Sequence, residues 1–261
     1  MGSLAGKSPS LTYKSLLKVS DETNGVSAAT SQVEDGEGTS TCISISDDQL
    51  AIKPQNDDST SAFVVKKSDN TSLLTIDSTN SLVKVGTSQV SATTQLLTFN
   101  AFNLVPTASG THMVVGLGGL EYNSGMAERT IGTGTDPSTS LNSTTTTDDY
   151  TNALFPVPYN IVIDAVKVLS SSTTDTDTTL NFHLMSYDMT ADGTTSDGDL
   201  SNGTVLADGQ ATSVDRSVTK STDLTIQSSS VTSGKVIMCT VENETNTNSI
   251  NLQVQVKYHI A

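Results

Sequence analysis

The sequence is poor in the residues that usually build a large hydrophobic core. It contains no Trp, aromatic residues make up 4% of the chain, and hydrophobic residues make up 34%. Typical globular domains reach about 45–50% when Gly is counted as apolar. No apolar run approaches the roughly 20 residues of a membrane-spanning helix, and the N-terminus lacks the apolar stretch of a secretory signal. We therefore expect neither membrane insertion nor a cleaved leader.

Basic residues are scarce as well. The chain has 13 Lys and Arg residues against 28 Asp and Glu residues, which gives a net charge of −15. Because such a surface repels phosphate groups, we expect neither nucleic acid nor an anionic membrane as a partner. The acidic residues are scattered through turns rather than collected in one tail, which is typical of a solvated surface.

Side chains suited to nucleophilic or metal chemistry are few. Cys42 and Cys239 do not predict a disulfide framework, and Cys239 alternates with apolar neighbours as a core residue would. His112, His183 and His259 each fall in a predicted strand, and no two have the spacing of zinc ligands. The Gly-x-Ser-x-Gly pattern of a nucleophilic serine is absent. We predict no enzyme, no catalytic residue, no metal ligand and no cofactor.

Glycine-rich and acidic stretches do not define a site either. The stretches "GLGGL" (116–120) and "GTGTDP" (132–137) fit neither common phosphate-binding pattern, and neither precedes a predicted helix. Asp192, Asp197 and Asp199 could offer oxygen ligands to Ca²⁺, but they lack the ligand order and closing Glu of an EF-hand. Turn formation explains these Asp-Gly steps more simply, and Ca²⁺ binding stays open.

The sequence does contain many Thr residues and regularly alternating apolar residues. In "SINLQVQVKYHI", apolar and polar residues alternate over residues 250–260, which predicts a strand with one buried face. Thr suits such a half-buried surface. We predict an all-β protein, with a jelly-roll-like β-sandwich over residues 91–261 and no helix of useful length. The other predicted strands are "QLLTFNAFNLV", "HMVVGLGGL", "YNIVIDAVKVL", "TLNFHLMSYDM", "GTVLADG", "DLTIQS" and "KVIMCTVE".

Residues 41–90 show shorter strands with one narrow apolar face. Pairs of apolar residues at spacing two are separated by polar turns such as "SDNT" and "STN". A marginal sheet of this kind needs a second layer. We predict that copies of the chain bury these faces against one another; the alternative is packing on the C-terminal domain of the same chain. The expected interface residues are Phe63, Val65, Leu74, Ile76, Val83 and Val85.

The first 40 residues differ from the rest of the chain. They are polar and rich in Gly and Ser, with one apolar patch, "TYKSLLKV". Their poverty in core residues suits an arm that becomes ordered on a partner. We therefore divide the chain into an arm (1–40), a short-strand region (41–90) and a sandwich (91–261).

Three stretches resemble bacteriophage virion fibre and decoration proteins. "VEDGEGTSTCISISDDQLAIKP" is similar to the DG-x-G, strand, turn, strand openings of phage fibre proteins. "SLLTIDSTNSLVKVGTS" resembles the strand repeats of their shafts and heads, and the run from "PYNIVIDAVKV" to "KYHIA" looks like marine-phage knobs. The resemblance implies a homotrimer in the virion, with residues 1–40 attached to capsid or tail proteins, 41–90 as a shaft or collar, and 91–261 as a knob. The short chain favours the capsid.

Two other hypotheses remain. One is a receptor- or carbohydrate-binding tail-fibre tip or surface adhesin, and the other is a hydrolase such as a capsule depolymerase. In a knob, the polar loops at 132–152, 171–178 and 191–203 would form the outward surface. Because Trp is absent, we expect contact with a host receptor, such as a surface glycan, to come from Tyr150 or Tyr187.

Overall fold

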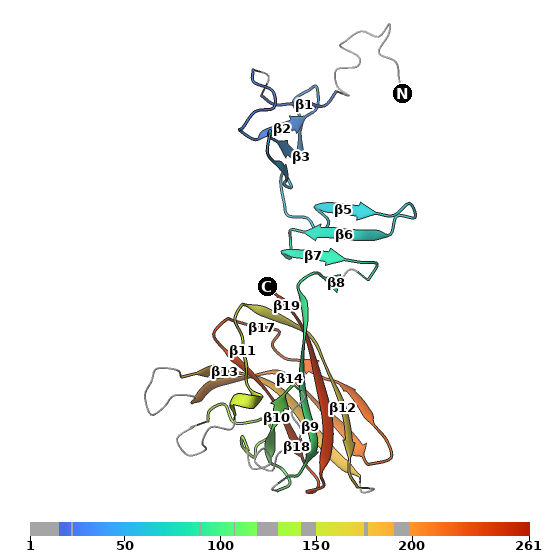
Figure 1. Ribbon diagram of the computed structural model, residues 1–261, viewed down its shortest axis with the longest axis vertical. Coiled ribbons are helices and arrows are strands. Elements are labelled where there is room, and N and C mark those ends of the chain that lie inside the picture. The colour runs from blue at the N-terminus through green and yellow to red at the C-terminus, as the bar shows by residue number, and fades with distance from the viewer. Residues whose placement is uncertain are drawn as a thin grey trace. The chain divides into compact units, whose positions relative to one another are not determined.

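The computed structural model is built from strands and turns (Figure 1). Its described residues contain no α-helix and one short 3₁₀ helix, η4 (Thr151–Ala153), which confirms the all-β prediction. The chain forms two compact units, residues 1–92 (unit 1) and 93–261 (unit 2). The structure describes residues 16–21, 23–88, 90–106, 108–118, 130–141, 150–174, 177–190 and 199–261.

Unit 1 begins with an antiparallel four-stranded sheet. Its strands, in spatial order, are β1 (Lys18–Val19), β2 (Ser31–Glu34), β3 (Ser40–Ile45) and β4 (Leu50–Ile52). Strand β2 pairs with β3 through Ser31↔Ile45 and Gln32↔Ser44. This pairing crosses the predicted boundary at residue 40, so the structure does not divide the chain there. Residues 1–15 of the expected arm lie outside the described residues.

The second sheet of unit 1 has the strand order β5 (Phe63–Lys66), β6 (Ser72–Asp77), β7 (Leu82–Val85) and β8 (Val90–Ser91), again antiparallel. The β6–β7 turn is held by Asp77, whose carboxylate accepts hydrogen bonds from the backbone N–H and the side-chain amide of Asn80 at 3.0 and 2.9 Å. Short polar side chains stabilise tight turns in this way.

Unit 2 is one eleven-stranded sheet folded into two halves, consistent with the predicted β-sandwich. The β12 half contains β9 (Thr94–Leu104), β12 (Ile161–Ser172), β15 (Lys220–Asp223), β17 (Ser230–Val231) and β19 (Ile250–Ile260). The β18 half contains β11 (Phe155–Pro156), β13 (Thr178–Met189), β14 (Leu200–Val214), β16 (Thr225–Ile226) and β18 (Val236–Asn243). Strand β10 (His112–Leu117) joins the halves, because its first four residues pair with β18 and its last two with β9.

The core of unit 2 lies between the halves. One hydrophobic cluster takes alternate residues of both, such as Val254 and Val256 from β19 and Phe182 and Leu184 from β13. The predicted alternation of β19 is therefore observed. Cys239 is fully buried in this cluster, and burial raises the pKa of its thiol.

The outer face of the β18 half is also covered, so that every residue of β18 is buried. The cover segment, residues 130–141, lies against this face: Tyr187 donates to the carbonyl of Ser138 at 2.9 Å, and the N–H of Gly203 donates to the carbonyl of Thr139 at 2.8 Å. A second hydrophobic cluster forms beneath it from Val114, Ile131, Met185, Tyr187, Met238 and their neighbours.

Gly203 permits the close approach of the cover segment. A Cβ at this position would lie 2.6 Å from Cε1 of Tyr187 and 2.7 Å from the Cα of Thr139. We expect Gly203→Ala to displace the cover segment and to lower the free energy of unfolding by about 1–3 kcal/mol, as other overpacking changes do. Denaturant unfolding measures this change. Gly134→Ala is the control, because its Cβ would meet only ordinary contacts of 3.4 Å or more; equal unfolding midpoints would contradict the prediction.

Candidate functional site

The apolar face of the β5–β8 sheet is formed by two cross-strand rows. Register pairs Phe63 with Ile76 and Ile76 with Val83 in the first row. The second row contains Val65, Leu74, Val85 and Val90. All six residues predicted from the sequence therefore lie on one face in contiguous register, with Val90 added; their role as a trimer interface stays a prediction.

This apolar face is the more exposed side of its sheet. Phe63, Val83 and Val85 are 38%, 41% and 43% exposed, whereas Thr75 and Asp77 on the opposite face are buried. Among the described residues of unit 1, no hydrophobic side chain is buried, and neither hydrophobic cluster includes one. Soluble sheets normally bury the apolar face and expose the polar one, so this arrangement calls for a covering layer.

The polar face of the same sheet satisfies its charges locally. Nζ of Lys84 lies 2.7 Å from the carboxylate of Asp77, whose side chain is fully buried. The hydrogen bonds from Lys84 and then Asn80 lower the pKa of Asp77 to about 2. The sheet thus has one face with internal polar partners and one face whose apolar side chains remain exposed.

The β1–β4 sheet repeats the pattern on a smaller scale. Ile43 pairs with Ile52 and Ile45 with Leu50, which places four apolar residues on one face. Ile43, Ile52 and Leu50 count among the exposed large hydrophobic residues, as does much of the β5–β8 face. Both sheets of unit 1 therefore present an apolar face.

The two tyrosines expected to contact a receptor are instead interior residues. Tyr187 is fully buried, and Tyr150 is 7% exposed and donates to the carbonyl of Thr130 at 3.3 Å. Burial raises the pKa of Tyr187 above its usual range. The cover segment is responsible, because it buries the face of β13 that would otherwise meet solvent. This placement corrects the expectation, since neither ring is available to a receptor.

The predicted outward loops are only partly described. Three parts of these loops lie outside the described residues: 142–149, 175–176 and 191–198. The last of them contains Asp192 and Asp197. In the loop predicted at 132–152, the described residues up to 141 belong to the cover segment and bond to the sheet beneath. This part of the loop does not project outward.

Two histidines lie side by side under the cover segment. The ring centroids of His112 in β10 and His183 in β13 are 5.0 Å apart in an edge-on arrangement. Nε2 of His112 lies 2.8 Å from the carbonyl of Gly134, and Nε2 of His183 lies 3.4 Å from the carboxylate of Asp136. Both side chains are buried, and neither Nδ1 has a hydrogen-bond partner within the described part of the chain.

Burial lowers the pKa of His183, and the electrostatic interaction with the neighbouring His112 lowers it further. The carboxylates of Asp136, Asp208 and Glu242 act in the opposite direction but do not reverse the shift. No signal in the sequence indicates this pair, because it depends on β10 and β13 both pairing with β18.

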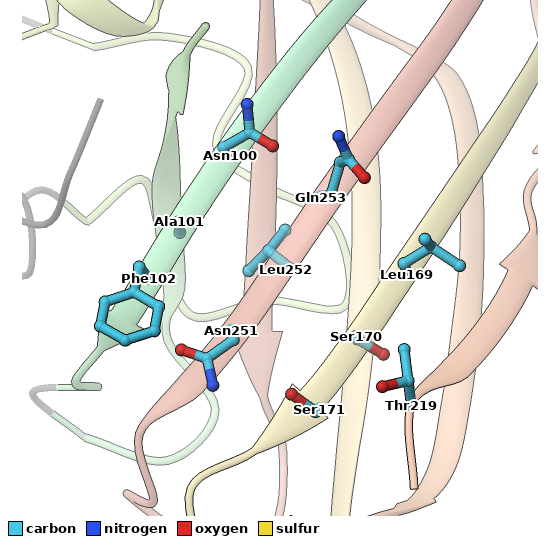
Figure 2. Close-up of a pocket in the computed structure, with 10 residues that line it drawn as sticks. All are labelled: Asn100, Ala101, Phe102, Leu169, Ser170, Ser171, Thr219, Asn251, Leu252 and Gln253. Atoms are coloured by element: carbon cyan, nitrogen blue, oxygen red, sulfur yellow. The ribbon is translucent and has the colours of Figure 1, made fainter. Parts of the chain in front are cut away.

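A groove of about 420 Å³ lies on the outer face of the β12 half (Figure 2). Most of its lining comes from β9, β19 and β12, with Asn100 opposite Gln253, Gln253 opposite Leu169, and Asn251 opposite Ser171, and Thr219 just before β15 completes it. Phe102 stands at one side and is 66% exposed. The groove is lined by Asn100, Ala101, Phe102, Leu169, Ser170, Ser171, Thr219, Asn251, Leu252 and Gln253, none of which is charged.

Comparison with known proteins adds no relative. No family model matches the sequence, and no curated protein is similar to it. Function must therefore be inferred from the surfaces of the chain itself.

The described part of the chain contains neither a metal-binding group of side chains nor a membrane-spanning helix. No group of three or more His, Cys, Asp or Glu side chains there is placed to hold a metal ion. Nor does any helix among those residues have the length and apolar character to cross a membrane.

Proposed function

We propose that this chain is a structural protein of a bacteriophage virion, a homotrimeric fibre or decoration protein whose subunits associate through the apolar faces of unit 1. The observation that supports association is the burial pattern of the β5–β8 sheet, in which the apolar rows are exposed while Thr75 and Asp77 on the opposite face are buried. The proposal assigns the chain no catalytic activity.

A second copy of the chain is the partner that fits these rows best. Burial of apolar surface is favourable by roughly 25 cal/mol per Å², and the two rows contain no charged side chain. Identical rows can therefore meet around a symmetry axis without bringing like charges together, although the chain as a whole carries −15. The number of three subunits comes from the resemblance of the short-strand repeats to phage fibre shafts.

The virion assignment rests on the same resemblance. It gives the N-terminal residues the task of attaching the protein to the capsid or tail, with the capsid favoured. Since β1 and β2 belong to a sheet with β3 and β4, we narrow the attachment segment to the residues that precede β1.

Deleting residues 1–15 tests both parts of the proposal. We expect the intact chain to have three times its 27.2 kDa mass in native mass spectrometry. The shortened chain should keep this assembly but should no longer join phage particles, as measured by its amount in purified virions. A monomeric intact chain would contradict the association, and normal incorporation of the shortened chain would contradict the attachment role.

A further inference from the structure

The groove on the outer face of the β12 half offers a binding surface separate from unit 1. We propose that it binds an uncharged sugar residue. Its volume of about 420 Å³ lies within the range of about 300–1,000 Å³ found for small-molecule sites. Two oriented amides, an exposed aromatic ring and the absence of charged side chains favour this ligand.

Two asparagine side chains in the groove are held in place by the backbone. Oδ1 of Asn251 accepts the N–H of Asn103 at 2.7 Å, so its amide nitrogen remains as a donor. Nδ2 of Asn100 donates to the carbonyl of Gly118 at 2.6 Å, so its amide oxygen remains as an acceptor. Since each hydroxyl of a sugar both donates and accepts, a fixed donor and a fixed acceptor in one groove suit its hydroxyls.

The apolar part of the groove suits the other face of a sugar ring. Phe102 is 66% exposed, although large aromatic side chains gain most from burial. Its ring offers an apolar plane on which the C–H groups of a sugar can stack, and Leu169 gives a second apolar contact across the groove. Ser171, Thr219 and Gln253 add hydroxyl and amide groups to the lining.

The lining does not suit charged ligands or an added peptide strand. Phosphate and sulfate groups select Arg or Lys, and Ca²⁺ or Mg²⁺ select carboxylates, but the groove has none of these. An extended peptide adds to a free sheet edge. Strands β9, β19 and β12 are all interior strands of the sheet, so they offer no such edge at the groove.

Saturation-transfer NMR on the full-length protein tests the proposal with three uncharged probes: maltotriose, cellotriose and triacetylchitotriose. We expect at least one probe to receive saturation, most strongly at its ring C–H protons. Phe102→Ala should weaken that binding by about tenfold or more, because the stacking plane is lost. Gln253→Ala should also weaken it, and this exposed side chain can be removed without opening the core.

Leu96→Ala is the matched control. Leu96 lies on the same outer face of β9 and is 61% exposed, but it does not line the groove. Its replacement should leave sugar binding unchanged.

The proposal is overturned if none of the three probes binds, or if Phe102→Ala and Leu96→Ala behave alike. It is also overturned if Phe102→Ala lowers the mass of the assembly without affecting a sugar, because the groove would then hold a second copy of the chain. The native mass of the intact chain tests the proposed function and does not depend on sugar binding. A failed sugar test therefore leaves the proposed function standing, and a monomeric chain leaves the sugar test standing.

Discussion

Val83→Asp is expected to dissociate the oligomer into single chains at micromolar concentration. In the assembled state the substitution would bring identical carboxylates together in an apolar layer, at a cost of several kcal/mol for each buried charge. Native mass spectrometry or sedimentation velocity would show the change as a loss of mass. We expect Ile76→Asp, in the same row, to act in the same way.

Leu73→Asp is the matched comparison for Val83→Asp. Leu73 is 39% exposed and Val83 is 41% exposed, so the isolated chain offers no reason for the two changes to differ. Leu73, however, lies on the face of β6 that also carries Thr75 and Asp77, opposite the apolar rows. We expect Leu73→Asp to leave the assembly intact. Equal behaviour of the two variants would show that the apolar rows do not form the contact between subunits.

Acidification below about pH 6.5 is expected to destabilise unit 2 through His183. Because the pKa of His183 is lowered in the folded chain, the unfolded chain binds a proton at a pH where the folded chain does not. The full stability is therefore present above the unfolded pKa of about 6.5 and falls as the pH drops toward the folded pKa. For one proton the slope is at most about 1.4 kcal/mol per pH unit.

Denaturant unfolding between pH 7.5 and pH 5 measures this slope. His183→Gln should flatten it, whatever its effect on stability at pH 7.5. The groups facing His183 are His112 on β10, Asp136 on the cover segment, Asp208 on β14 and Glu242 on β18, and they remain in the variant. Leu184→Val removes one methylene from the neighbouring buried residue and should keep the wild-type slope. A slope that survives in His183→Gln would contradict the role of this histidine.

Local alternation was enough to predict β19 and the apolar face of the β5–β8 sheet. The six apolar residues of the β5–β8 sheet were identified because spacing two places side chains on one face of a strand, and short turns keep neighbouring strands in register. For the same reason the alternation of residues 250–260 predicted β19 correctly. These features depend only on residues close together in the sequence.

Features that depend on strand order could not be predicted. Tyr187 alternates like an outward-facing residue, yet the cover segment buries it from a position 49 residues away. The His112–His183 pair requires β18 between its two strands. Similarly, Phe102 and Asn251 come together in the groove only because β9 and β19 pair. Such pairings are decided by the packing of the whole unit rather than by local sequence.

The position of β19 within its sheet has a consequence for folding. Strand β19 is the last described strand, yet it lies between β9 and β12 and pairs with both, for example Val254 with Phe99 and with Val168. Contacts between such distant parts of a chain slow folding, because a long loop must close before they form. During synthesis, β9 and β12 leave the ribosome with unpaired edges that attract other chains. The β12 half can be completed only after β19 has emerged, so the edges of β9 and β12 that face β19 stay unpaired until then.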